Sequence, residues 1–130
     1  MAKLVDANLL IRYFTQDNPQ QALSVKKLLR DFNQDLILSD LTVAEVVWVL
    51  ELTYKLSRDN ISELIISLLS VPSLRANNHL LTRALFFYRE LNTSYFDAYL
   101  AAVCEEENLD GIYSFDKGLD KIPGIKRFEP

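Results

Sequence analysis

Four acidic residues stand at positions that could build a site for divalent cations: Asp6, Glu45, Asp97 and Asp116. Carboxylate oxygens are the ligands that Mg²⁺ and Mn²⁺ prefer in proteins. Four carboxylates placed close together would repel one another, and their pKa values would rise unless cations neutralised them. Two such cations, roughly 3.5–4 Å apart, can orient a water for attack on a phosphodiester and stabilise the leaving oxygen. The hypothesis from these residues is therefore metal-dependent hydrolysis of a phosphodiester.

Each acid also has a purely structural interpretation. Asp6 follows a short apolar run and could cap the helix after it. Glu45 forms a capping-box pattern with Thr42, although Ser39-Asp40 offers an alternative start for the same helix. If the helix begins at that earlier point, the side chain of Glu45 is available for another role.

The two later acids have equally ordinary interpretations. Asp97 follows Ser94 by three residues, which is again a helix cap followed by an acid in the first turn. Asp116 opens the turn Asp116-Lys117-Gly118 after an apolar run. One acid alone is weak evidence, so the prediction of a metal site depends on all four meeting in one place.

Short apolar runs alternate with segments of helical spacing along the chain. Strands are expected at 3–5, 36–38, 74–76, 112–115 and 125–128, and helices at 8–14, 18–32, 41–56, 61–69, 80–91 and 96–104. This alternation predicts the α/β class, with a mainly parallel sheet covered on both faces. Ligands of such sheets lie outside the carboxyl ends of the strands. Asp6 and Asp116 each follow an expected strand directly, which places both at that edge.

Composition predicts one domain spanning residues 1–130. The single cysteine excludes an intramolecular disulfide and favours a reducing cytoplasm, and no apolar run is long enough to cross a membrane. The net charge of −4 argues against nucleic acid as a partner. That objection weakens if some acids bind cations, because a carboxylate cluster holding divalent ions presents positive charge to a phosphate.

The sequence offers few residues for other kinds of catalysis or metal binding. The one histidine, His79, is expected at the surface near a helix start, and Cys104 is expected to be an inert core thiol. Trp48, Phe96 and Tyr99 are expected to pack in the core, although Tyr95, Phe96 and Tyr99 could instead stack on bases. The chain has no Gly-rich phosphate loop and no Cys/His spacing typical of zinc sites.

The segments around the four acids resemble the motifs of PIN domains, most closely those of VapC-type toxins. They are VDANLLI (5–11), VAEVVWVL (43–50), YFDAYLAA (95–102) and SFDKGLD (114–120). The resemblance extends from about residue 3 to residue 128. It implies a PIN-like α/β/α sandwich in which helices flank a short, mainly parallel central sheet.

The resemblance also implies an activity and partners. A VapC-type protein is a Mg²⁺- or Mn²⁺-dependent endoribonuclease, a homodimer, and the toxin of a type II toxin–antitoxin system that a cognate antitoxin protein neutralises. Asp6, Glu45, Asp97 and Asp116 would be the catalytic, metal-binding acids, and Asp120 could replace or assist Asp116.

Further residues are implied around those acids. Asn8 and Ser114 would hydrogen-bond the carboxylates. Arg12, Lys117 or Lys121 would hold the RNA backbone, although solvated surface charge is the simpler interpretation for each.

Three alternatives stay open. A PIN-like domain could bind RNA or protein without cleaving it. A haloacid-dehalogenase-like phosphatase also begins with a strand and an aspartate, but it needs a second acid where Asn8 stands. A receiver domain needs an adjacent pair of acids near the first strand, whereas Glu45 falls within an expected helix.

Overall fold

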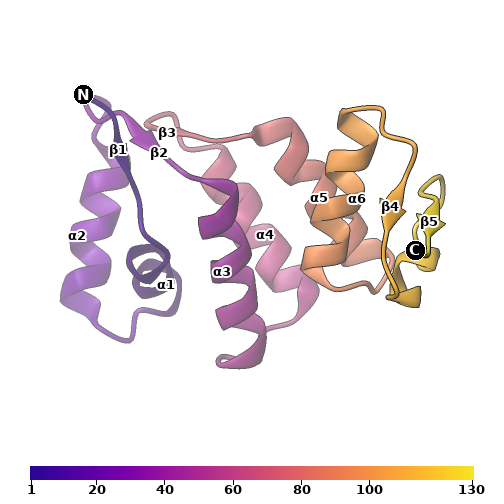
Figure 1. Ribbon diagram of the computed structural model, residues 1–130. Helices are drawn as coiled ribbons and strands as arrows, with labels where there is room; N and C mark the ends of the chain where they lie inside the picture. The colour runs from indigo at the N-terminus through magenta and orange to yellow at the C-terminus, as the bar shows by residue number, and fades with distance from the viewer. The chain divides into compact units, whose positions relative to one another are not determined.

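The computed structural model describes residues 1–130 and divides them into two compact units, Met1–Asn78 and His79–Pro130. The N-terminal unit contains β1 (Lys3–Leu4), α1 (Ala7–Thr15), α2 (Pro19–Arg30), β2 (Leu36–Ile37), α3 (Asp40–Leu52), α4 (Arg58–Leu69) and β3 (Leu74–Arg75) (Figure 1). The C-terminal unit contains α5 (Asn78–Glu90), which begins at the boundary, α6 (Tyr95–Glu106), β4 (Ile112–Tyr113), the short 3₁₀ helix η1 (Lys117–Lys121) and β5 (Arg127–Phe128).

The sheet of the N-terminal unit is parallel, with the strand order β1-β2-β3. Leu36 of the central strand pairs with Lys3 on one side and with Leu74 on the other. Hydrogen bonds continue past the strand ends, because the Val5 N–H donates to the Ile37 carbonyl and the Leu38 N–H donates to the Arg75 carbonyl. The carboxyl ends of the three strands therefore share one edge.

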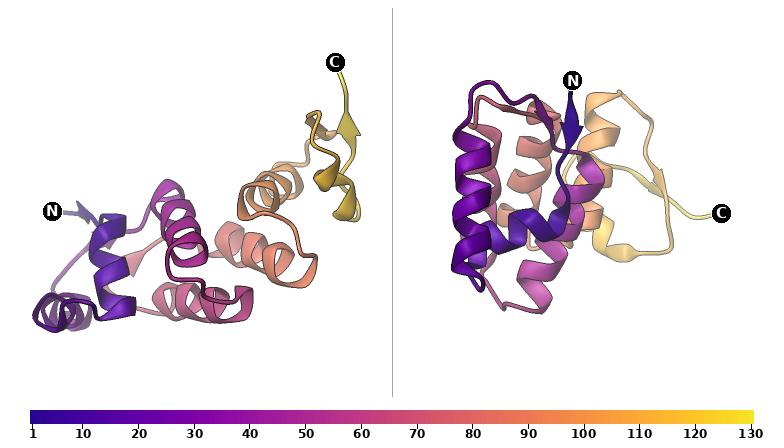
Figure 2. Two further views of the ribbon diagram at one scale, coloured as in Figure 1. Left: turned by 90° about the horizontal axis from the view of Figure 1, so that it is seen from below. Right: turned by 90° about the vertical axis from the view of Figure 1, so that its left-hand side faces the viewer.

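Apolar spacing determines which face each helix of this unit buries. On α2 the buried residues are Ala22, Val25 and Leu29, and on α3 they are Val43, Val46, Val47 and Leu50. Helix α1 packs against α2 and α3, and it runs across α2 instead of alongside it (Figure 2). The side chains of Asn18, Ser39 and Ser57 cap the N-termini of α2, α3 and α4.

In the C-terminal unit, α5 and α6 are joined at two points. The rings of Tyr88 and Tyr95 meet edge to face with centroids 5.8 Å apart, and Arg83 forms an ion pair with Glu105 at 2.7 Å. Strands β4 and β5 pair in parallel, with Ile112 opposite Arg127, and η1 lies between them in the chain. This short pairing brings β5 beside the segment that carries Asp116.

The predicted α/β class is confirmed, and every expected strand and helix is present. The strands are divided between a three-stranded and a two-stranded sheet, and all pairings are parallel. The helix expected at 41–56 ends earlier, at Leu52, and Phe32 lies beyond the end of α2. None of the helices could span a lipid bilayer.

Two predictions of core packing are wrong. Trp48 is 53% exposed, because α3 buries the face that carries its valines and Leu50. Phe96 is also 53% exposed, because α6 buries the small residues Ala98, Ala101 and Ala102 instead. Tyr99 is intermediate in exposure. The predictions for Cys104, which is buried, and for His79, whose side chain is 86% exposed, are confirmed.

Candidate metal centre

The carboxylates of Asp97 and Asp116 lie together in the C-terminal unit. Asp97 stands in the first turn of α6, where Ser94 Oγ accepts a hydrogen bond from its N–H at 3.1 Å. Asp116 follows β4 and opens η1. A Cβ atom built on Gly118 would lie 3.0 Å from Asp116 Oδ1 and 3.5 Å from Asp97 Oδ2. Both carboxylates therefore border the same space in front of Gly118.

The closeness of these two carboxylates changes their electrostatics. Burial raises the pKa of Asp97, and the negative charge of Asp116 raises it further, against a smaller opposing effect of the hydrogen bond from Ser94. A divalent cation bound beside the two carboxylates would offset their repulsion. Its positive charge would also compensate for the hydration that burial removes. The donors of this pair therefore fit a hard, oxygen-seeking cation.

Asp116 closes a turn, as the sequence predicts, and its carboxylate also lies beside that of Asp97. Its Oδ1 accepts a hydrogen bond from the Gly118 N–H at 2.8 Å, and its own N–H donates to Ser114 Oγ at 2.9 Å. A carboxylate has about four acceptor positions, so one bond within the turn leaves others for a ligand. Ser114 thus supports the Asp116 backbone, whereas the family resemblance implied that it bonds a carboxylate.

The carboxylate of Asp120 forms an ion pair with Arg127. Arg127 Nε donates to Asp120 Oδ1 at 3.0 Å, and Arg127 Nη2 donates to Asp120 Oδ2 at 3.4 Å. The geometry therefore favours Asp116 over Asp120 as the partner of Asp97.

In the N-terminal unit, Asp6 does not use its side chain to cap a helix. It stands at the N-cap of α1, but its carboxylate accepts no capping hydrogen bond, and the residue is exposed. The interpretation of Asp6 as a hydrogen-bonding helix cap is therefore wrong. The position is the one expected of an acid just beyond the carboxyl end of β1.

Glu45 is likewise not part of a capping box. Ser39 caps α3 by accepting a hydrogen bond from the Thr42 N–H at 3.1 Å, so Glu45 lies in the second turn and is exposed. Thr42 Oγ1 donates to the Val5 carbonyl at 3.5 Å, which ties the first turn of α3 to the end of β1. Residues three apart on a helix share a face, so Glu45 stands one turn beyond this junction.

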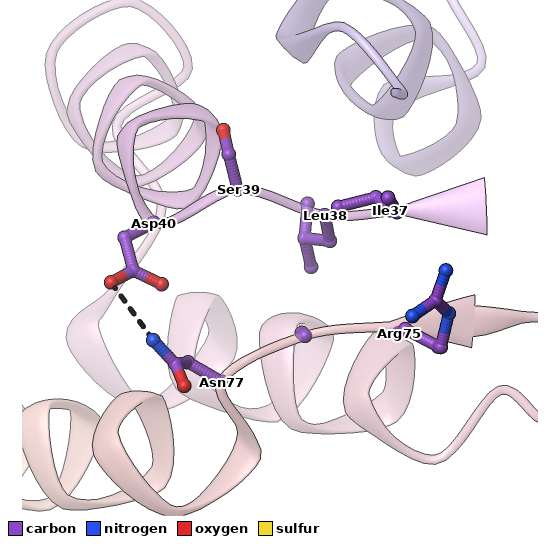
Figure 3. Close-up of a pocket in the computed structure, with 7 residues that line it drawn as sticks. Ile37, Leu38, Ser39, Asp40, Arg75 and Asn77 are labelled. Atoms are coloured by element: carbon purple, nitrogen blue, oxygen red, sulfur yellow. Dashed lines mark hydrogen bonds between the residues drawn. The ribbon is translucent and has the colours of Figure 1, made fainter. Parts of the chain in front are cut away.

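A hollow of about 470 Å³ lies at the carboxyl ends of β2 and β3, lined by residues 37–40 and 75–77. Asp40 and Asn77 point toward each other from its two sides, and a 3.4 Å hydrogen bond joins them (Figure 3). Arg75 lies further along and binds Asp35 through two hydrogen bonds of 2.7 and 3.1 Å. A carboxylate and an amide at this edge can hydrogen-bond a polar ligand. Asn77 directly follows the expected strand at 74–76, but its residue type alone does not predict the contact with Asp40.

Neither unit by itself brings three potential metal ligands together. Asp6 and Glu45 belong to the N-terminal unit, whereas Asp97 and Asp116 belong to the C-terminal unit. The convergence of all four acids therefore stays a prediction.

The family to which the chain belongs follows from its match to a known protein family. The PIN domain family matches residues 3–125, which include all four acids and all four motif segments. The chain belongs to the PIN domain family. The resemblance drawn from the motifs is thus confirmed at the level of the family, and the short parallel sheet with its helices is a PIN-like α/β fold. No curated protein matches the chain.

Membership in the PIN family gives the acids a chemical context. PIN domains are generally nucleases, they act on RNA, and they typically use divalent metal ions. The paired carboxylates of Asp97 and Asp116 are donors of the type that such ions require.

Proposed function

We propose that this PIN domain protein is a Mg²⁺- or Mn²⁺-dependent endoribonuclease, and that Asp6, Glu45, Asp97 and Asp116 form its active site. The observation that carries the proposal is the pair of carboxylates in front of Gly118, where burial and Asp116 together raise the pKa of Asp97. Two carboxylates this close repel each other when no cation is bound. Acids with perturbed pKa values are typical of functional sites.

On this proposal, residues 1–130 form one PIN domain built from both units. The family match supports this, because it runs from residue 3 to residue 125 and so crosses the boundary between Asn78 and His79. Asp6 would join Asp97 and Asp116 as a direct metal ligand, and Glu45 would bind the metal directly or through water. The bound cations would supply activation of a water and neutralisation of charge on the leaving oxygen.

The protein's own residues would hold the acids and the RNA. The Gly118 N–H holds one oxygen of Asp116, and Ser94 holds the backbone of Asp97. Lys117 is exposed and directly follows Asp116, so it can contact a phosphate next to the site. Lys121 is also exposed, at the last position of η1, and Arg12 lies on α1.

The biological role that fits this activity is that of the toxin in a type II toxin–antitoxin system. The support is the resemblance of the four motif segments to VapC-type toxins. On this proposal the protein acts in the cytoplasm as a homodimer, and a cognate antitoxin protein neutralises it. Expression should then arrest growth, and Asp6→Asn should abolish the arrest at equal protein level.

The enzymatic proposal is tested by incubating purified protein with structured RNAs in Mn²⁺ or in EDTA. Wild type should release products only with the metal, and Asp6→Asn and Asp97→Asn should each lower the rate at least about 100-fold. Asp110→Asn, an exposed acid of the same charge, is the matched control and should cleave normally. RNA binding that is insensitive to EDTA and gives no products would instead identify a PIN-like binding module.

A further inference from the structure

Arg127 connects the two flanks of the segment that carries Asp116. It is the first residue of β5, and its side chain is only 12% exposed. Its Nη1 donates to the Ser114 carbonyl at 2.9 Å, on the N-terminal side of Asp116. Its Nε donates to Asp120 at 3.0 Å, on the C-terminal side.

We propose that Arg127 is a positioning residue for the metal-binding pair Asp97 and Asp116, acting through Ser114 and Asp120. The inference rests on the proposed function, because the acids it positions are the metal ligands named there. The hydrogen-bond partners of Arg127 are Ser114, Asp120 and Glu129, so it would act on the pair indirectly.

Hydrogen bonds within the segment connect Ser114, which Arg127 holds, to the carboxylate of Asp116. Ser114 Oγ accepts from the Asp116 N–H at 2.9 Å, and Asp116 Oδ1 accepts from the Gly118 N–H at 2.8 Å. With Ser114 and Asp120 both tied to one guanidinium, the turn between them is closed around Asp116. The side of Gly118 that lacks a Cβ then borders Asp116 Oδ1 and Asp97 Oδ2.

The shape of the guanidinium suits this task better than a simple positive charge. Arginine presents several N–H donors in a fixed planar fork, whereas the lysine ammonium is a point charge on a flexible stem. Arg127 uses that fork on acceptors of three residues, since Nη1 also donates to Glu129 Oε1 at 2.7 Å. The parallel pairing of Tyr113 with Phe128 sets β5 beside β4. The position of Arg127 is therefore fixed by β5, which lies outside the segment that its guanidinium binds.

The test compares Mn²⁺ binding by the full-length wild type, Arg127→Lys and Asp120→Asn, followed by electron paramagnetic resonance without RNA. Both variants should weaken the Kd for Mn²⁺ by about 10–100-fold, the usual effect of losing a residue that orients a ligand. Asp120→Asn should leave the unfolding midpoint nearly unchanged, because Asp120 is 56% exposed and surface ion pairs add little stability.

The matched control is Glu105→Gln, which removes an equivalent pair. Arg83 and Glu105 also form a two-bonded ion pair in the C-terminal unit, but Glu105 lies near the opposite end of α6 from Asp97. This variant should bind Mn²⁺ as wild type does.

The possible outcomes distinguish failure of the positioning role from failure of the proposed function. If wild type binds Mn²⁺ and Asp120→Asn binds it equally well, the positioning role is overturned and the proposed function stands. The positioning role is also overturned if the variants lose only thermal stability and keep their Mn²⁺ affinity. If wild type binds no Mn²⁺, the proposed function fails and the positioning role fails with it. Should Arg127→Lys fail to fold, Asp120→Asn decides the question.

Discussion

Asp97 and Asp116 come from the first turn of one helix and from the end of one strand, yet their carboxylates border the same space in front of Gly118. The two residues are brought together by the C-terminal unit alone. Their shared space depends on the missing side chain of Gly118, on the cap that Ser94 provides and on the turn that Asp116 itself closes.

Gly118→Ala should weaken metal binding by filling this space. The added methyl group would stand 3.0 Å from Asp116 Oδ1, so that oxygen would have to shift by a few tenths of an ångström, whereas 3.5 Å to Asp97 Oδ2 is ordinary van der Waals contact. We expect the Kd for Mn²⁺ to rise about tenfold, as when a ligand loses its orientation. Calorimetric titration with Mn²⁺ measures this, and circular dichroism checks the fold. Unchanged affinity would show that the space in front of Gly118 is not where the metal binds.

Asp97→Asn should stabilise the metal-free protein. Burial and the charge of Asp116 raise the pKa of Asp97, so the folded state holds this proton more tightly than the unfolded state does. The stability that the protonated group contributes is therefore lost as pH rises through the raised pKa. At neutral pH in EDTA, the uncharged asparagine should raise Tm by about 2 °C or more.

Added Mn²⁺ should reverse that order. Wild type should gain stability by binding the ion, whereas Asp97→Asn lacks a proposed ligand and should gain little. Thermal unfolding with and without Mn²⁺ measures both effects. A variant that is less stable than wild type in EDTA would contradict the predicted repulsion between Asp97 and Asp116.

Gly111→Ala should destabilise the fold itself. A Cβ on Gly111 would stand 2.2 Å from the Lys126 carbonyl oxygen and 2.8 Å from the Phe128 ring, so β4 and β5 would have to separate. We expect a loss of roughly 2 kcal/mol or more in the free energy of unfolding, typical of overpacking against a rigid backbone. Urea denaturation measures the loss. A stability equal to that of wild type would mean that the β4–β5 pairing is not formed in solution.

Trp48→Ala should cost far less stability than Leu50→Ala. Trp48 is 53% exposed, whereas Leu50 is completely buried. Truncation of a buried leucine costs about 2–5 kcal/mol, and substitutions at the surface usually cost about 0.5 kcal/mol or less. Urea denaturation followed by circular dichroism compares the two variants. Equal losses would indicate that Trp48 is buried in solution.

Local sequence signals predicted the elements well, because helical spacing, caps and apolar runs act over a few residues. They failed where packing between elements decides the outcome. The large side chains Trp48 and Phe96 are exposed, because valines on α3 and alanines on α6 form the buried faces.

The candidate site shows the same division. Asp6, Asp97 and Asp116 stand at the strand end, helix turn and loop that their sequence context predicts. Neither of two competing assignments could be decided from sequence. Ser39 and not Thr42 caps α3, and Asp120 pairs with Arg127, a contact that depends on how β5 lies against β4.

We propose that acids of both units hold the same metal ions, and Mn²⁺ binding to single variants tests this proposal most directly. Asp6→Asn in the N-terminal unit and Asp97→Asn in the C-terminal unit should each weaken the same binding event by at least about tenfold, while Asp110→Asn should not. Normal Mn²⁺ binding by Asp6→Asn, with loss only in Asp97→Asn, would contradict a site shared between the two units.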